Sequence, residues 1–232
     1  MSDIPEPDQS ECQFEALIEG YRRFRKDAYN RQRERYDALA NKGQSPKIMV
    51  IACCDSRVDP TIIFDAEPGQ MFVLRNVANL VPPFETGTGG SRHGASAAIE
   101  FAVTGLEVEH IVVMGHARCG GISASLAGKL GKEKPEGEPV SFIDRWMSII
   151  SPVRDQIVMA YEIAPDMDPQ RALELAAIRQ SIKNLRTFPF VEERVQNGTL
   201  KLHGAYFAVS DGILQLLEPD SEQFAPVELP WE

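Results

Sequence analysis

The stretch His110-Ile-Val-Val-Met-Gly-His-Ala-Arg-Cys-Gly-Gly121 decides how this chain folds. A β-branched apolar run stops at Gly115, and His116 and Cys119 follow directly. A short, continuous apolar run of this kind is typical of a buried strand in a parallel sheet. The pattern therefore predicts a strand that delivers an imidazole and a thiol to its carboxyl end.

A second stretch upstream repeats this arrangement. In Lys47-Ile-Met-Val-Ile-Ala-Cys-Cys-Asp-Ser-Arg57, an apolar run ends in Cys53, Cys54 and Asp55. The carboxyl ends of parallel strands meet at one edge of a sheet, and sites in such proteins lie beyond that edge. Two strands that each end in thiols and a His or an Asp therefore predict one shared metal site.

The composition excludes several classes of function. The chain has 232 residues, 43% of them hydrophobic and 25% charged, as in an ordinary soluble protein. Its net charge of −10 argues against nucleic acid as a partner, and no apolar run is long enough to span a membrane. The acidic start is unlike a targeting signal, and four cysteines, two of them adjacent, favour a reducing compartment over a disulfide framework. We expect a cytoplasmic protein.

The remaining patterns alternate between strand and helix. This alternation predicts an α/β fold with a mainly parallel central sheet flanked by helices. Strands are expected at 47–52, 71–74, 110–114, 200–209 and 212–217, and helices from 14, near 60–66, and at 94–103, 121–130, 141–150, 152–162, 169–186 and 190–196. The two charged or glycine-rich segments 79–94 and 131–139 are expected to be loops.

The N-terminal region carries an amphipathic, basic helix. From Phe14 the apolar residues follow helical spacing, and seven Arg and Lys residues follow between 22 and 35. This basic segment is either a solvated helix face or part of an oligomer interface. Residues 1–12, rich in Pro, Asp and Glu, are expected to form a flexible tail.

Thiolates and imidazoles are the ligands that zinc prefers, in a tetrahedral shell that catalytic sites leave open at one position. His116 and Cys119 have a spacing that lets one turn supply two ligands, and the third would come from Cys53 or Cys54. The alternative is that the cysteines are small buried hydrophobic residues. Because thiols, a histidine and two glycines occur together, the pattern favours the metal site.

Asp55 and Arg57 stand two positions apart at the end of the first strand. A carboxylate beside the metal could occupy the fourth position or accept a proton from bound water. An Arg next to this carboxylate would keep it ionised and hold it away from the metal. The alternative is an ordinary surface ion pair.

Three ordered motifs make the chain similar to the β-class carbonic anhydrases. They are Cys53-Cys-Asp-Ser-Arg57, Arg75-Asn-Val-Ala-Asn79 and Gly115-His-Ala-Arg-Cys-Gly-Gly121, and the likeness extends from about residue 45 to 212. It includes the helix Gly94-Ala-Ser-Ala-Ala-Ile-Glu-Phe-Ala-Val103 and Leu202-His-Gly204. The resemblance implies a lyase that catalyses reversible hydration of CO2 to bicarbonate and a proton by zinc-bound hydroxide.

The resemblance also implies the roles of individual residues. Cys53, His116 and Cys119 correspond to the zinc ligands, and Asp55 and Arg57 to the dyad that opens the fourth position, with Asp55 as the fourth ligand in a closed state. The family implies a single zinc-binding catalytic domain, here 13–232. It further implies a homodimer or larger homo-oligomer in which N-terminal helices extend onto the partner subunit.

This chain departs from the family pattern at several positions. Cys54 stands where the family usually has Ser, and Glu67 and Phe188 align with a Gln and a Tyr that lie beside the substrate in plant-like members. Phe142 aligns with an aromatic residue of the apolar pocket, and Gly120 is expected to border the same pocket. The expected substrate-pocket residues are thus Phe142, Glu67, Phe188 and Gly120.

A regulatory bicarbonate site in some members uses Trp, Arg and Tyr. The aligned residues are Val50, Arg75 and Phe207, so the resemblance implies the plant-like type without this switch.

Other functions stay open at this stage. The same site would suit hydrolysis of a related heterocumulene such as COS or CS2. Alternatively, Cys53-Cys54 would serve a thiol-dependent redox protein, or the metal would support an interaction module without catalysis. Retention of both Asp55 and Arg57 argues against the last, because a closed structural site needs neither.

Overall fold

The computed structural model describes residues 13–86, 94–131 and 141–230. The chain divides into two compact units, Met1–Gln44 and Ser45–Glu232, and all six strands of the sheet belong to the second. The predicted flexible tail, residues 87–93 of the first predicted loop and residues 132–139 of the second lie outside the described residues. A single domain over 13–232 stays a prediction.

Three helices form the described part of the first unit. They are α1 (Gln13–Lys26), α2 (Ala28–Arg31) and α3 (Arg33–Lys42). The amphipathic helix predicted from Phe14 is therefore confirmed, but none of its residues is buried. Phe14 and Leu17, on the apolar side of α1, are 66% and 69% exposed.

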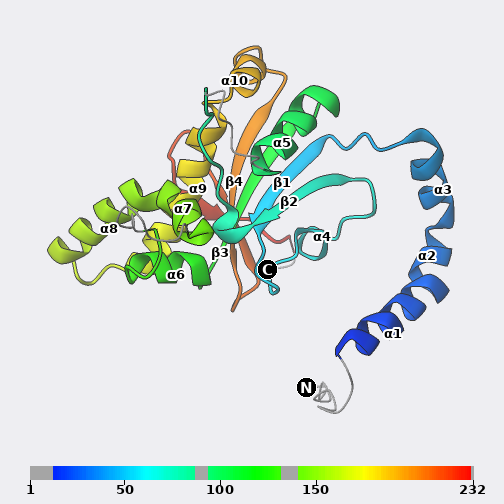
Figure 1. Cartoon of the computed structure of the whole chain (residues 1–232), viewed down its shortest axis with the longest axis horizontal. Helices are drawn as coiled ribbons and strands as arrows, with labels where there is room; N and C mark the ends of the chain where they lie inside the picture. The colour runs from blue at the N-terminus through cyan, green and yellow to red at the C-terminus, as the bar shows by residue number, and fades with distance from the viewer. Residues whose placement is uncertain (1–12, 87–93, 132–140, 231–232) are drawn as a thin grey trace. The chain divides into compact units, whose positions relative to one another are not determined.

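The second unit is built on a six-stranded sheet in the order β2-β1-β3-β4-β5-β6 (Figure 1). The prediction of a mainly parallel sheet is confirmed, because the first four strands in this order are parallel to one another. Only the last two pairings, β4 with β5 and β5 with β6, are antiparallel. The last strand, which contains a proline, was not predicted. The strands are β1 (Ile48–Cys53), β2 (Met71–Asn76), β3 (His110–His116), β4 (Lys201–Ala208), β5 (Ile213–Leu217) and β6 (Phe224–Pro226).

The helices of this unit begin where the sequence predicts. Asp59 and Asp168 cap helices that have proline in the first turn, and each carboxylate accepts a hydrogen bond from a backbone N–H of that turn. Four helices end about three or four residues earlier than predicted, one of them in a π-helical turn at Phe101–Gly105. The helices are α4 (Pro60–Ile63), α5 (Gly94–Glu100), α6 (Gly120–Leu126), α7 (Phe142–Met147), α8 (Ser151–Ile163), α9 (Pro169–Leu185) and α10 (Pro189–Gln196).

Helix α9 packs closely on β3 and β4, at two glycines (Figure 1). A Cβ atom on Gly115 would lie 2.8 Å from both Cγ1 and Cδ1 of Ile178, and one on Gly204 would lie 3.1 Å from Ile178 Cγ2. A Cβ atom on Gly115 would force Ile178 to move, and one on Gly204 would crowd both Ile178 and Leu217. The glycines therefore allow α9 to approach the sheet more closely than other residues would.

The buried face of α9 includes Ile178 and Leu185, whereas Leu175 and Ile182 are only partly buried. It also includes the acidic residue Glu174, one turn before Ile178.

None of the helices in the described ranges is both long and apolar enough to span a membrane.

Candidate metal centre

Three buried side chains meet at the carboxyl edge of the central strands. Cys53 ends β1, His116 ends β3, and Cys119 precedes the first residue of α6. One ligand atom from each, two sulfurs and a ring nitrogen, lies within 4.8 Å of the other two. The sequence left Cys53 and Cys54 as alternatives. The structure separates them, because Cys53 is buried in this cluster whereas Cys54 is exposed.

The cluster fits zinc. Tetrahedral zinc with bonds of about 2.3 Å to sulfur and about 2.0 Å to nitrogen holds its ligand atoms about 3.5–3.8 Å apart, within the observed limit. The His116 ring is fixed by Nδ1, which lies 2.9 Å from the carbonyl oxygen of Ala117. Nε2 is buried and has no hydrogen-bond partner. A buried nitrogen without a partner is costly, and a metal at this position would satisfy it.

The cluster also favours negative charge on sulfur. A hydrogen bond from the Cys119 thiol, assisted by His116, lowers the pKa of Cys53 to about 4 despite burial. The same hydrogen bond raises the pKa of Cys119, whose proton is shared with Cys53. Burial acts to lower the pKa of His116, but the neighbouring Cys53 thiolate outweighs it, and the net shift is upward. Metal binding needs thiolates, and one is already favoured here.

Asp55 and Arg57 form a two-point ion pair beside the cluster. Arg57 Nε lies 2.9 Å from Asp55 Oδ1, and Nη2 lies 2.7 Å from Oδ2. These hydrogen bonds hold the pKa of the Asp55 carboxyl well below its usual range. Asp55 Oδ2 is 3.9 Å from His116 Nε2. An ionised carboxylate therefore lies next to the cluster, turned toward Arg57.

Arg75 fixes the turn that carries Cys53 and Asp55. Its Nε donates to the carbonyl oxygen of Cys53 at 3.0 Å, and Nη2 donates to that of Asp55 at 2.7 Å. Nη1 forms an ion pair with Asp59 at 2.9 Å. The sequence pointed to Arg75 through the motif that it begins and through the regulatory-site comparison, and gave no sign of this supporting role.

Glu174 is the residue near the cluster that sequence reasoning missed. Its carboxylate accepts hydrogen bonds from the backbone N–H of Cys119 at 3.0 Å and from the Tyr206 hydroxyl at 2.9 Å. Burial and the neighbouring charge of Glu174 raise the pKa of Tyr206. An acidic residue four positions before Ile178, on the same helix face, was the available signal.

The structure does not gather the four predicted pocket residues in one place. Phe188 is a core residue, 2% exposed, and its ring packs against those of Phe84 and Phe190. It belongs to the hydrophobic cluster beneath α5 and α10, whereas Cys53 and Cys119 belong to another.

Phe142 begins α7, and its side chain is 88% exposed among the described residues. Glu67 lines a hollow of about 340 Å³ with residues of the α4–β2 turn, apart from the cysteines and His116. Gly120 does adjoin the cluster. It follows Cys119, and a Cβ placed on it would meet nothing within 4 Å.

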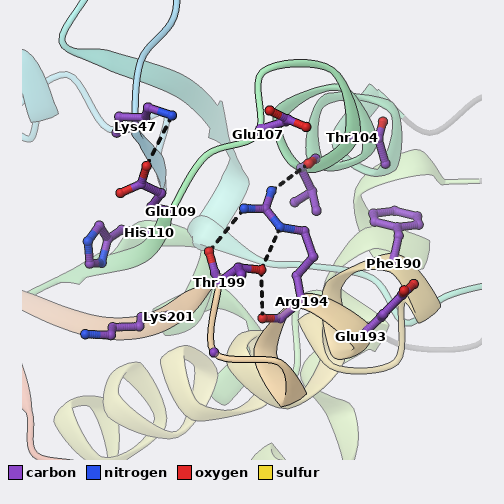
Figure 2. Close-up of a pocket in the computed structure, with 12 residues that line it drawn as sticks. Lys47, Thr104, Glu107, Glu109, His110, Phe190, Glu193, Arg194, Thr199 and Lys201 are labelled. Carbon is purple, nitrogen blue, oxygen red and sulfur yellow. Dashed lines mark hydrogen bonds and ion pairs between the residues drawn. The ribbon is translucent and has the colours of Figure 1, made fainter.

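A cavity of about 780 Å³ lies at the opposite ends of the strands (Figure 2). Lys47, His110 and Lys201 stand where β1, β3 and β4 begin, and Arg194 is held by hydrogen bonds to Thr199 and to the carbonyl oxygen of Val103. No member of the metal cluster lines this cavity. Because sites of α/β sheets lie beyond the carboxyl ends, the cavity is not part of the metal centre.

The fold and the cluster define an α/β protein with a three-ligand metal centre at the carboxyl edge of its parallel strands. Residues 48–214 match the protein family described as carbonic anhydrase. The chain therefore belongs to the carbonic anhydrase family, and its relatives place it in the β class.

Two of these relatives come from Arabidopsis thaliana. Beta carbonic anhydrase 5, chloroplastic, is 39% identical over 199 residues, which cover 85% of this chain and 62% of that protein. Beta carbonic anhydrase 6, mitochondrial, is 38% identical over 196 residues, covering 83% and 63%. The chain thus spans slightly less than two thirds of the length of these relatives.

Solved structures agree with this assignment. The β-carbonic anhydrase CcaA superposes with a TM-score of 0.81 at 29% identity, over 94% of this chain and 93% of that chain. A tetrameric β-carbonic anhydrase from Sordaria macrospora superposes with a TM-score of 0.74 at 27% identity, over 94% and 100%.

Proposed function

We propose that this protein catalyses the reversible hydration of CO2 to bicarbonate and a proton, with zinc held by Cys53, His116 and Cys119. The observation that carries the proposal is the buried cluster of two thiols and an unpartnered His116 Nε2. Three protein ligands leave one tetrahedral position free for water, as in catalytic rather than structural zinc sites. The relatives named beta carbonic anhydrases support the same reaction.

Zinc would act as a Lewis acid that makes water acidic enough to lose a proton near neutral pH. Asp55 would accept a hydrogen bond from that water through Oδ2, the oxygen nearest His116 Nε2. Each carboxylate oxygen has two lone pairs, so Oδ2 can serve Arg57 and the water together. This bond would orient an oxygen lone pair toward the carbon of CO2.

Arg57 would keep Asp55 from binding the metal. Its guanidinium contacts both oxygens of the carboxylate, and Nη2 also donates to the carbonyl oxygen of Arg118 at 3.1 Å. Moving Asp55 onto the metal would break at least one of these bonds. The ion pair therefore favours the open fourth position over a closed one.

The surroundings of the two cysteines suit an apolar substrate. Both pack in a hydrophobic cluster with Val58, Ala78 and Ile122, each at most 2% exposed. CO2 carries no charge and loses little when it leaves water for such a surface. The same low-dielectric surroundings strengthen the interaction of Asp55 with a bound water.

We also propose that the protein is a homo-oligomer in which α1 contacts a partner subunit. The apolar residues Phe14, Leu17 and Tyr21 of α1 are all more than half exposed, and burying them would stabilise an assembly. Light scattering on the full chain should give a dimer or larger species, and Leu17→Asp should lower the mass. A monomeric wild-type chain would refute this part.

A cytoplasmic location is proposed on the cysteines. Cys53, Cys54 and Cys119 form no disulfide within the described residues, which favours a reducing compartment. The Arabidopsis relatives carry the names chloroplastic and mitochondrial. Cell fractionation with an antibody against the chain would decide, and recovery in an organelle would exclude the cytoplasm.

The proposed activity is tested by stopped-flow CO2 hydration together with the zinc content. Wild type should hold one zinc per chain and be active. Cys119→Ala should lose both zinc and activity, because a ligand is removed. Cys54→Ser is the matched control: it removes an exposed thiol next to the cluster and should keep both. Full activity in Cys119→Ala would end the zinc proposal, and activity lost only in Cys54→Ser would favour a thiol mechanism.

A further inference from the structure

The turn from His116 to Cys119 carries two of the three proposed zinc ligands and is conformationally strained. Arg118 has φ of 56°, in the left-handed region that residues with a side chain rarely adopt. A turn of this kind persists only when its neighbours hold it in place. The direction of the Cys119 thiol therefore depends on the contacts that restrain this turn.

Four backbone groups of the turn have specific hydrogen-bond partners. Three of these bonds restrain the residues before Cys119: Ala117 N to Phe207 O at 2.9 Å, His116 Nδ1 to Ala117 O at 2.9 Å, and Arg57 Nη2 to Arg118 O at 3.1 Å. At Cys119 itself the backbone N–H donates to Glu174 Oε1 at 3.0 Å. Glu174 is thus the side chain that restrains the main chain of this ligand.

The Glu174 carboxylate is itself held in one orientation. The Tyr206 hydroxyl donates to Oε2 at 2.9 Å, and Gln170 Nε2 donates to Oε1 at 3.0 Å. Glu174 is only 4% exposed. Its position follows from the close approach of α9 at Gly115, because Ile178 and Glu174 lie one turn apart on the same helix face.

We propose that Glu174 is a positioning residue for the metal centre. By fixing the Cys119 amide, the carboxylate fixes the direction of the Cys119 sulfur toward Cys53 and His116 before any metal binds. Glu174 is not a ligand, because both its oxygens are engaged by Cys119, Tyr206 and Gln170. The inference rests on the proposed zinc site and assigns to it a support that connects α9 and β4.

The test compares zinc affinity in four proteins by competition with a chelator: wild type, Glu174→Ala, Glu174→Gln and Ser181→Ala. Ser181 is the matched control, because it lies on the same helix, is fully buried and also makes two hydrogen bonds, with Val81 N and Asn79 O at 3.2 Å. It restrains no part of the turn that carries the ligands. Loss of stability alone would therefore affect Ser181→Ala and Glu174→Ala alike.

Glu174→Ala should weaken zinc binding by about 10- to 100-fold, the usual effect of losing a residue that orients a ligand. Absorption of the cobalt(II)-substituted protein should also change in its thiolate-to-cobalt band, because the sulfur is no longer held in one direction. Glu174→Gln should restore most of the affinity, since its amide oxygen can accept from Cys119 and its NH2 group can donate to Tyr206. Ser181→Ala should lower the melting temperature and leave affinity and spectrum unchanged.

The inference is overturned if Glu174→Ala binds zinc as tightly as Ser181→Ala, or if Glu174→Gln is as impaired as Glu174→Ala. Should Glu174→Ala fail to fold, Tyr206→Phe takes its place, because it removes one restraint on the carboxylate and leaves the carboxylate present. Affinity unchanged in Tyr206→Phe would overturn the inference too. A wild-type chain that binds no zinc refutes the proposed function as well, whereas zinc binding insensitive to Glu174 refutes only this inference.

Discussion

Gly115→Ala tests the close packing of α9 against the strand that carries His116. The new Cβ would lie 2.8 Å from Cγ1 and Cδ1 of Ile178 and 3.5 Å from Asn79 Oδ1. Carbon atoms in contact normally stay about 3.5–4.0 Å apart, so Ile178 must withdraw by about 0.7–1.2 Å. Ile178 is fully buried, and Cγ1 is too near the main chain to move alone. Helix α9 must therefore shift.

Overpacking of this kind costs about 1–3 kcal/mol of the free energy of unfolding. For a chain of this size, each kcal/mol lowers the melting temperature by about 2–4 °C, so a fall of about 2–12 °C is expected. Gly120→Ala is the control, because a Cβ there meets nothing within 4 Å and its free-energy change should stay within about 0.5 kcal/mol.

Urea unfolding at one fixed subunit concentration measures these costs. The double variant with Ile178→Ala isolates the contact. Ile178→Ala alone should cost about 2–5 kcal/mol, and the double variant should cost less than the two single changes together by about 1–3 kcal/mol. Gly115→Ala no more destabilising than Gly120→Ala, or strict additivity in the double variant, would refute the close-packing argument.

The remaining predictions concern the ion pair of Asp55 and Arg57, and the side chain of His203. Arg57→Gln should lower kcat for CO2 hydration by about 10- to 100-fold with zinc content unchanged, because Asp55 is freed to compete for the fourth position; unchanged kcat would show that Arg57 does not hold Asp55 away. Burial, together with the charges of His110 and Lys201, lowers the pKa of His203 in the folded protein. The stability that neutral His203 contributes is therefore present above its unfolded-state pKa of about 6.5 and is lost as pH falls below that value. His203→Gln should therefore reduce the loss of melting temperature between about pH 7.5 and 5.5, and an identical loss in both proteins would contradict this assignment.

The sequence was sufficient to predict the sheet and the residues that it brings together. Apolar runs that stop at Cys53 and at Gly115 indicate buried parallel strands, and parallel strands share one carboxyl edge. Cys53, His116 and Cys119 were therefore expected in one place, and they are adjacent in the structure.

The residues around the cluster could not be predicted in this way. Glu174 contacts Cys119 and Tyr206, which are far from it in the chain, only because glycines let α9 approach the sheet. For Phe188, an aromatic residue type does not distinguish a core position from a pocket wall. Its packing beneath α10 is decided by the turn from α9 into α10.

Cys53 ends β1 and Cys119 precedes α6, and α4, β2, α5 and β3 lie between them in the chain. An ion held between their sulfurs would be a cross-link that closes a long loop of the chain. Cross-links of this kind restrict the unfolded chain more than the folded one. The bonds from these sulfurs to the ion would then contribute both to the stability of the fold and to the activity. A chelator would therefore lower the stability while it removed the activity.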